Sequence, residues 1–545
     1  MTTIATIQLL VGLLVVVSLV ALVANRLRVP HAVLLVIVGV LLAVVPGLPT
    51  VKLAPEFVLL IVLPPLIYSS AVAMSWREFR FNLRPIVLLA VGCVLFTAAA
   101  AAAAAHWLLG FPWAVGFVLG AIISPPDAVA PLSVARRMRL PHRLLVVLEG
   151  EGLANDATAL ILYRFAVAAV SAGVFSASGA AGTFAIIVAG EIAWGLAVGW
   201  LMLRLRRWVR DPRIEITLSI LTPFLAYWPP EYLGGSGVLA TVTAGLYISW
   251  NGLRLISAAT RLQGIFFWDL FIYLIEGMVF LVTGLQARAL TVGIHGHGLR
   301  GLVLAALVAC AVVILARFIW TYPAIYLPRM LSPALAKRDP APPWQQAFVL
   351  AFTGVRGIVS LAAALAIPLT VASGMPFPQR DLILFLTFSV VLVTLVGQGL
   401  LLPVVIRALG LANTGEQEHA ALRAQEHLAR RQAVEAALAR LETLAGERGL
   451  PAEVLEPLRA RHRERLRHTR HRGDGDAAHL RLLEADDQVE LLLIEAEREQ
   501  INELYRLGDL QDEVRRRIER ELDLEEARIR HALASASNAD LEPPD

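Results

Sequence analysis

Three short motifs place charged side chains inside stretches of the chain that are otherwise apolar. SPPDAVAP contains Asp127, LEGEGLANDATAL contains Asp156, and GVRGIVS contains Arg356. A charged side chain in a membrane helix costs about 2.5–3.5 kcal/mol on insertion scales, so such residues normally have a partner and a function. These three motifs are therefore the first candidates for a functional site.

The SPPDAVAP motif cannot form a continuous helix. Its three prolines fall within seven residues, and each removes a backbone N–H and strains the turn before it. The freed backbone groups are tolerated at membrane depth only beside other protein or a water-filled cavity. Broken helices of this kind build cation sites in transporters. We therefore expect Asp127 to lie at a helix break and to bind a cation.

The LEGEGLANDATAL motif carries three acids within eight residues. At about 100° per residue, Glu149 and Asp156 share one helix face, whereas Glu151 lies about 140° from Asp156. Two roles are therefore expected. One face would hold a transported ion, and the other would hold a structural ion pair.

The third motif places Arg356 near the middle of an apolar segment, with Gly354 and Gly357 on either side. An arginine stays protonated, so a carboxylate is expected nearby. The glycines let another helix or an unwound backbone approach closely. Arg356 is therefore predicted to neutralise an acid of the second motif.

The charges of these motifs point to exchange of ions. Four central groups sum to −2 when ionised: Asp127, Glu151, Asp156 and Arg356. Such a site must take up either a proton or a cation, because two uncompensated charges are costly there. Oxygen ligands favour a hard ion, and the absence of clustered His or Cys argues against zinc or copper.

The composition identifies the elements that must position these motifs. The 545 residues are 57% hydrophobic and 17% charged, whereas soluble domains average about 45–50% apolar and about 25% charged. A water-soluble enzyme is therefore excluded. Collagen-like, disordered and disulfide-scaffold classes are excluded too, since the chain has only two cysteines.

Thirteen apolar segments alternate with short polar loops before Leu411. A lipid-facing backbone must satisfy its own hydrogen bonds, so we expect an all-α membrane protein with about 13 transmembrane helices. Spans 1–6 and 8–13 would form two inverted six-helix repeats, each with an interrupted fifth helix. The segments are 6–25, 31–46, 57–74, 85–109, 112–135, 143–170, 181–203, 214–229, 236–250, 264–287, 298–326, 345–371 and 381–407.

The loops predict the orientation of the chain. With thirteen spans, nineteen basic residues fall in one set of alternate loops and four in the other. The positive-inside rule places the richer set in the cytoplasm, so the N-terminus is expected outside and the C-terminus inside. The predicted location is the cytoplasmic membrane.

Two domains are predicted, a transmembrane domain over 1–410 and a cytoplasmic helical domain over 411–545. The second is rich in Glu, Arg, Ala and Leu and has apolar residues at helical spacing. About three helices are expected, with either a solvated or a regulatory and oligomerising role. Its basic residues are interleaved with acids, so no nucleic-acid partner is expected.

Glu276 and Arg317 lie inside the tenth and eleventh segments and are secondary candidates, together with Glu149. Glu276 and Arg317 are expected to pair with each other or with Arg164. A structural network is the favoured interpretation.

Taken together, the three motifs resemble those of the monovalent cation/proton antiporter-1 family, specifically its bacterial Na⁺/H⁺ antiporter branch. The resemblance covers about residues 7–408. It implies an inverted-repeat fold whose broken helices cross at the midplane, homodimers and elevator-like alternating access. It also implies electroneutral exchange of one cation against one proton.

The resemblance also implies roles for single residues. Asp156 resembles the aspartate that carries the ion and the proton, and Asn155 resembles its polar neighbour, which holds either a helix or Asp127. Asp127 resembles the acid at the helix crossing and a second Na⁺ ligand. Glu151 and Arg356 resemble a core-stabilising ion pair.

Three further positions follow from the same comparison. Glu276 matches an acidic residue in a similar LxEGxxFxxxG stretch of the family. Many members have Thr where this chain has Pro126, and Ser where it has Gly152. Because both differences remove a hydroxyl, Ser124, Thr158 or backbone carbonyls are expected to complete the ligand set.

The predicted function is therefore secondary active exchange of Na⁺, or Li⁺, for H⁺, for pH and sodium homeostasis, with no cofactor. The main alternative is a K⁺/H⁺ antiporter. A membrane-embedded enzyme would need an Asp-rich metal–diphosphate run or a catalytic dyad, and neither is evident. A non-transporting sensor remains as a third class, although 412–545 carries no recognisable signalling motif.

Overall fold

The computed structural model describes the greater part of the chain. The described residues are 3–27, 29–46, 54–172, 177–209, 211–252, 255–256, 258–288, 298–448, 451–473, 477–507 and 512–537. The chain divides into two compact units, Met1–Glu416 and Gln417–Asp545. Regular structure in the described residues is helical, apart from one isolated bridge between Thr370 and Pro376. The predicted all-helical class is confirmed.

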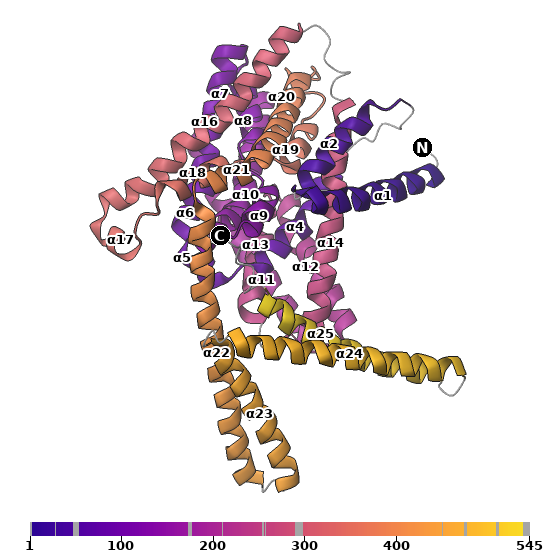
Figure 1. The fold of residues 1–545 in the computed structure, drawn as a ribbon. Helices are drawn as coiled ribbons and strands as arrows, with labels where there is room; N and C mark the ends of the chain where they lie inside the picture. Colours follow the sequence, from indigo (N-terminus) through magenta and orange to yellow (C-terminus); the bar gives the residue numbers. More distant parts are fainter. Residues whose placement is uncertain are drawn as a thin grey trace. The chain divides into compact units, whose positions relative to one another are not determined.

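The first unit is a bundle of helices, several of which are interrupted or contain a widened π-helical turn, labelled η (Figure 1). Its first half contains α1 (Thr3–Leu27), α2 (His31–Val44), α3 (Pro55–Phe57), η1 (Val58–Val62), α4 (Leu63–Ala73), α5 (Trp76–Phe81), α6 (Leu83–Val87), η2 (Leu88–Cys93), α7 (Val94–Leu109), α8 (Trp113–Ile123), α9 (Val129–Arg137) and α10 (His142–Ala172). Its second half contains α11 (Ala177–Arg206), α12 (Pro212–Tyr232), α13 (Val238–Asn251), α14 (Ala258–Leu285), α16 (Leu299–Leu331), α17 (Pro333–Arg338), α18 (Trp344–Phe352), α19 (Ile358–Leu365), α20 (Arg380–Leu392), η4 (Val393–Gln398) and α21 (Gly399–Ala408).

Eight helices in the described part of the chain are long and apolar enough to cross a membrane. They are Gln8–Leu27, Pro55–Ala73, Leu83–Leu109, His142–Ser171, Gly179–Arg206, Thr260–Leu285, Leu299–Leu331 and Arg380–Ala408. Each of the thirteen predicted segments overlaps a helical stretch, and the other five overlap helices that are shorter, less apolar or interrupted. The number of crossings and the internal repeats stay predictions.

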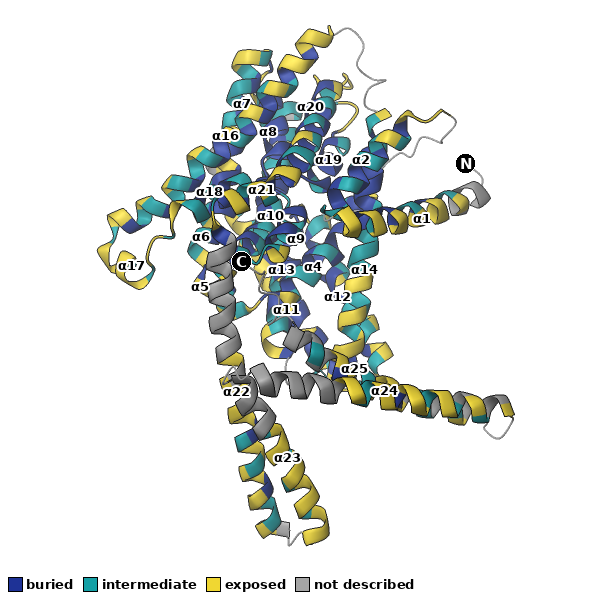
Figure 2. Ribbon diagram, in the orientation of Figure 1, coloured by how far each residue is buried: buried dark blue, intermediate teal, exposed yellow. Residues whose placement is uncertain are grey.

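Outward-facing side chains of the first unit are apolar. Leu22 on α1 is 67% exposed, Trp200 on α11 is 56% exposed and Phe266 on α14 is 71% exposed. Large exposed apolar surfaces mark contact with another protein or a membrane. Together with the long apolar helices, these faces fit a protein that is surrounded by lipid. Buried residues gather instead on α8, α10 and α13 (Figure 2).

The two interruptions predicted from the sequence are present. The chain is helical up to Ile123 and again from Val129, and it is helical up to Phe352 and again from Ile358. Prolines break the first helix, because they cannot donate the backbone hydrogen bonds that would continue it. α8 packs against α7, α10, α19 and α20, so this broken pair lies at the centre of the bundle.

One carboxylate ties together the ends of three helices. They lie where the basic loops with Arg84, Arg143 and Arg329 come together, and we call this side of the first unit the arginine-rich face. Asp339 accepts bonds from Arg84 at 2.6 Å, Arg143 at 2.6 Å and Arg329 at 2.9 Å. Burial alone would raise the pKa of Asp339, but the hydrogen bond and charge of Arg143, with the charge of Arg329, hold it below its usual value. We call this cluster the Asp339 clamp; it fastens α6, α10 and α16.

The second unit is also helical, and it receives most of α22 (Leu411–Arg448) together with α23 (Ala452–Gly473), α24 (Ala477–Leu507) and α25 (Asp512–Ser537). It therefore contains four helices rather than about three. α24 packs on α25 through a small apolar cluster of Leu491, Ile494, Ile518, Leu522, Ile529 and Leu533. Arg459 of α23 bonds Glu442 of α22 at 2.6 Å.

Candidate functional site

The two interrupted helices meet at their breaks. The backbone N–H of Asp127 donates to the carbonyl of Val355 at 2.6 Å. In the opposite direction, Arg356 donates from Nε to the carbonyl of Ile123 at 2.9 Å and from Nη2 to that of Ser124 at 3.3 Å. These bonds satisfy backbone groups that an interrupted helix leaves open. Each break therefore supplies the partners that the other lacks.

Asp127 lies at the positive ends of two short helices. Its Oδ1 accepts the N–H of Val129 at 2.9 Å, at the start of α9. Its Oδ2 lies against Gly357, the residue before α19, so closely that a Cβ there would come within 1.6 Å of it. Since a helix N-terminus carries partial positive charge, both helix ends compensate the Asp127 carboxylate.

Arg356 occupies the complementary position at two helix C-termini. Besides Ile123 and Ser124 at the end of α8, it donates from Nη1 to the carbonyl of Gly354, just after α18. The side chain is 1% exposed. Helix C-termini carry partial negative charge, so these carbonyls stabilise the guanidinium without a bonded carboxylate.

The predicted Glu151–Arg356 ion pair is therefore wrong. Glu151 pairs with Arg317 of α16 instead, with Oε1 accepting from Nη1 at 2.5 Å and Oε2 from Nη2 at 2.9 Å. Arg317 also donates to the carbonyl of Leu350 at 3.0 and 3.2 Å. A bidentate pair satisfies both carboxylate oxygens, which a buried charge requires. Gly354 leaves the space, because a Cβ there would lie 2.4 Å from Cδ of Arg317.

The expected pairing of Glu276 with Arg317 or with Arg164 is wrong as well. Arg164 pairs with Glu231 of α12. The carboxylate of Glu276 lies 4.0 Å from Nε2 of His31, the first residue of α2. The long sequence separation of these partners hides such pairings from a reading of the sequence.

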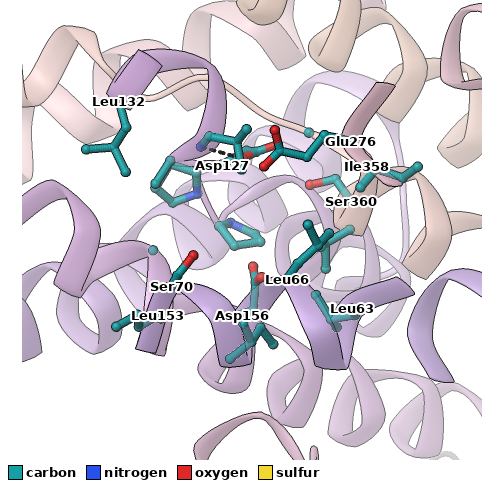
Figure 3. Close-up of a pocket in the computed structure, with 18 of the residues that line it drawn as sticks. Leu63, Leu66, Ser70, Asp127, Leu132, Leu153, Asp156, Glu276, Ile358 and Ser360 are labelled. Carbon is teal, nitrogen blue, oxygen red and sulfur yellow. Dashed lines mark hydrogen bonds between the residues drawn. The ribbon is translucent and has the colours of Figure 1, made fainter. Parts of the chain in front are cut away.

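A cavity of about 100 Å³ lies beside the crossing, and its lining brings together residues from five helices, α4, α9, α10, α14 and α19, and from the two breaks (Figure 3). Apolar residues form most of its wall. Its polar lining consists of Ser70, Asp127, Glu149, Asp156, Glu276 and Ser360. In Figure 3 the carboxylate of Asp156 points into the pocket from α10, while Asp127, Glu276 and Ser360 gather on another side of it.

Asp156 differs from two of the other acids of the cavity. Asp127 accepts a backbone N–H and Glu149 pairs with Arg136 at 3.1 Å, whereas no hydrogen-bond donor or cation of the described residues bonds Asp156. Glu276 lies 4.0 Å from the ring of His31 and makes no closer contact with a cation of the described residues. Asp156 and Glu276 are therefore the cavity carboxylates that are available to a mobile cation or proton.

Asn155 holds α10 against the first break. It is fully buried, and its Nδ2 donates to the carbonyl of Pro126 at 2.6 Å. Its Oδ1 is buried and accepts no bond from the described residues. Asn155 was expected to hold either a helix or Asp127. Its bond to the carbonyl of Pro126 corresponds to the first of these roles. The free Oδ1 adds an oxygen next to Asp156 in the chain.

Like Asn155, the other two predicted ligands do not line the cavity. The hydroxyl of Ser124 donates to the carbonyl of Ala121 at 3.2 Å, and that of Thr158 donates to the carbonyl of Ala154 at 3.5 Å. Neither residue lines the cavity. Both hydroxyls are used locally, as Ser and Thr hydroxyls within helices commonly are.

The sequence did not lead us to expect two residues whose hydroxyls belong to the cavity wall, Ser70 and Ser360. Ser360 could have been found, because it lies in the third motif three residues after Gly357. Ser70 stands in the third segment without any acidic or glycine-rich neighbour, so the sequence carried no signal for it.

Comparisons with known proteins agree with this geometry. The family model for "Sodium/hydrogen exchanger, transmembrane" matches residues 13–408. An uncharacterised Na⁺/H⁺ exchanger of Mycobacterium tuberculosis is 37% identical over 532 residues, covering 95% of this chain and 96% of its own. A sodium, potassium, lithium and rubidium/H⁺ antiporter of Bacillus pumilus is 33% identical, covering 67% of this chain and 56% of its own.

A solved structure supports the fold. The sodium proton antiporter of Methanocaldococcus jannaschii superimposes with a TM-score of 0.60 at 20% sequence identity, covering 76% of this chain and 99% of that one. At this level of identity the likeness concerns the fold alone.

Proposed function

Because this chain belongs to the sodium/hydrogen exchanger family, whose members are secondary transporters and not enzymes, we propose that it exchanges Na⁺ or Li⁺ for H⁺ across the cytoplasmic membrane. The observation that carries the proposal is the unpartnered carboxylate of Asp156 in a small cavity beside two crossed helix breaks. A cation and a proton compete for that carboxylate, so binding of one releases the other.

We propose electroneutral exchange, one cation for one proton, as the resemblance to the antiporter family implies. Glu151 is neutralised by Arg317, and Asp127 and Arg356 are opposite charges held at opposite helix ends. When ionised, Asp156 carries one unit of negative charge, which a single monovalent cation or a single proton cancels. The same number of charges then crosses in each direction.

The cation ligands are oxygen atoms, as a hard ion prefers. We assign the carboxylate of Asp156 as the main ligand, with Asp127 across the cavity as a second. The free Oδ1 of Asn155 lies outside the cavity lining, and we keep it as a candidate because no described residue bonds it. The cavity hydroxyls of Ser70 and Ser360 replace Ser124 and Thr158 in this proposal, because those two hydroxyls bond their own helices.

K⁺/H⁺ exchange is the second candidate. The relative from Bacillus pumilus is named for sodium, potassium, lithium and rubidium, so one similar protein is not restricted to small cations. The absence of hydroxyls at Pro126 and Gly152 favours the same relaxation.

We further propose homodimers, as the family resemblance implies. On the basis of the arginine-rich loops, we propose that the N-terminus lies outside and the C-terminus in the cytoplasm. Residues 1–410 carry transport through two inverted repeats, and 411–545 form a regulatory or oligomerising domain. Alternating access to Asp156 supplies the coupling.

The test is dequenching of a pH-sensitive dye in everted vesicles after separate additions of Na⁺, Li⁺ and K⁺. Dequenching by Na⁺ or Li⁺ that is lost in Asp156→Asn would support sodium-type exchange. Dequenching by K⁺ as well, or alone, would favour the second candidate. No response to any cation between about pH 6 and 9, with the chain present in the membrane, would overturn the proposal.

A further inference from the structure

Along α10, the cavity lining extends from Asp156 toward the start of the helix and not beyond Asp156. Along α10 its lining begins at Glu149 and stops at Asp156, and it includes Ser70 close to the end of α4. The end of α4 and the start of α10 both lie on the arginine-rich face. Beyond Asp156, α10 continues through Leu160, which is packed in the largest apolar cluster with Tyr227. The far side of the site is therefore shut.

An ion pair lies beyond this apolar seal. Arg164, two turns past Asp156 on α10, donates from Nη2 to Oε1 of Glu231 near the end of α12. The main packing partners of α12 are α4, α11, α13 and α14, and those of α10 are α8, η2, α13 and α6. The ion pair thus joins α10 to a helix that is not among its main packing partners.

The surroundings of the pair are suited to opening. The Arg164 side chain is 31% exposed and that of Glu231 is 20% exposed, so separating them does not strand a charge in an apolar interior. Oε2 of Glu231 and the hydroxyl of Tyr163 are buried and have no partner in the described residues. Buried polar groups without partners are costly, and water entering an opened far side would satisfy both.

We propose that the Arg164–Glu231 pair is the lock that holds the far side shut, and that it thereby sets which side of the membrane Asp156 faces. This inference rests on the proposed exchange, because an exchanger must open Asp156 to each side in turn. Both are positioning residues, since neither touches the cavity that holds the ion.

The test measures how often the cavity is open toward the arginine-rich face. Ser70→Cys places a thiol in the cavity wall, and a membrane-impermeant thiol reagent is applied from that face in vesicles. The native cysteines, Cys93 and Cys310, are only 3% and 6% exposed. Their labelling is measured in the chain without the Ser70 substitution and is subtracted as background. An exposed ion pair contributes about 0.2–1 kcal/mol, so Glu231→Gln and Arg164→Ala should each slow labelling by up to about fivefold.

Charge complementarity separates a lock from a merely structural contact. The swapped pair, Arg164→Glu with Glu231→Arg, should restore the labelling rate. Glu78→Gln removes the charge from the 2.8 Å contact with His142 at the opposite end of α10 and is the matched control, which should label at the rate of the chain that carries Ser70→Cys alone. Unchanged labelling in both single variants would overturn the lock, and so would slowed labelling that the swap does not restore.

Exchange measured in the same vesicles distinguishes the two proposals. If labelling shifts as expected while the native chain moves no protons in response to Na⁺, Li⁺ or K⁺, the lock stands and the proposed function fails. If the native chain exchanges ions and labelling does not shift, the function stands and the lock fails.

Discussion

Arg317 holds Glu151 through two parallel hydrogen bonds of 2.5 and 2.9 Å, and both side chains are at most 2% exposed. The pair connects α10 to α16 behind the cavity face of α10. The pair neutralises Glu151, the one acid of the second motif that does not line the cavity. As a result, Asp156 and Glu151 can serve different purposes although they are only five residues apart.

Removing one partner of this pair should destabilise the protein strongly, because it leaves a buried charge uncompensated. Arg317→Met should lower the free energy of unfolding by about 3–5 kcal/mol. The measurement is the thermal melting temperature in detergent. The double variant Arg317→Met with Glu151→Leu should recover much of the loss, and a double variant as unstable as the single one would argue against the pairing.

Gly357 should tolerate no side chain. A Cβ there would come within 1.6 Å of Oδ2 of Asp127, so Gly357→Ala must displace the carboxylate or the start of α19. We expect at least a tenfold loss of cation-dependent proton movement, since displacements of about 1 Å at a reacting centre cost about 10²-fold. Gly301→Ala, on α16 with open space around the new Cβ, is the matched control and should transport normally. Normal exchange by Gly357→Ala would contradict the geometry of the crossing.

The Asp339 clamp should contribute stability that depends on pH. The folded-state pKa lies below the ordinary value of 3.8, so the contribution is present above that value and is lost as pH falls through the lower, folded-state pKa. Asp339→Asn should therefore lower the free energy of unfolding at pH 7 by about 2 kcal/mol. The variant should accordingly melt at a lower temperature than the native chain. The difference should shrink below about pH 3.8. A difference that stays constant across this range would show that the carboxylate charge is not the cause.

In the second unit, Ile529→Ala should loosen the contact of α25 with α24. Ile529 is 2% exposed, and truncation of a buried isoleucine costs about 2–5 kcal/mol. Limited proteolysis should cut α25 faster in this variant. Leu493→Ala is the control, because Leu493 is 59% exposed on α24 and its removal leaves no cavity. Equal protection of the two variants would be evidence against the packing of α24 on α25.

The sequence predicted the local features of the site well. Prolines in SPPDAVAP and glycines in GVRGIVS locate the two interruptions, because backbone chemistry decides them. The helical repeat separates Glu149 and Asp156 from Glu151 on α10, and the structure places the first two in the cavity wall and the third against Arg317.

Long-range pairing was the part that the sequence did not reveal. Arg317 and Arg356 are both central arginines in apolar segments, and nothing in their neighbours tells which one reaches Glu151. Tertiary packing decides which arginine pairs with Glu151. Arg356 donates instead to the carbonyls of Ile123, Ser124 and Gly354, which only the crossing brings together. Likewise, Ser70 enters the cavity because of where α4 packs.

The crossing is held by two different kinds of contact. One is purely a backbone bond, from the N–H of Asp127 to the carbonyl of Val355, and the other joins the guanidinium of Arg356 to the carbonyls of Ile123 and Ser124. Any residue except proline at position 127 keeps the first contact, because it needs only a peptide N–H. The second contact depends on a single side chain, so the junction between the two broken helices has one interchangeable fastening and one irreplaceable one.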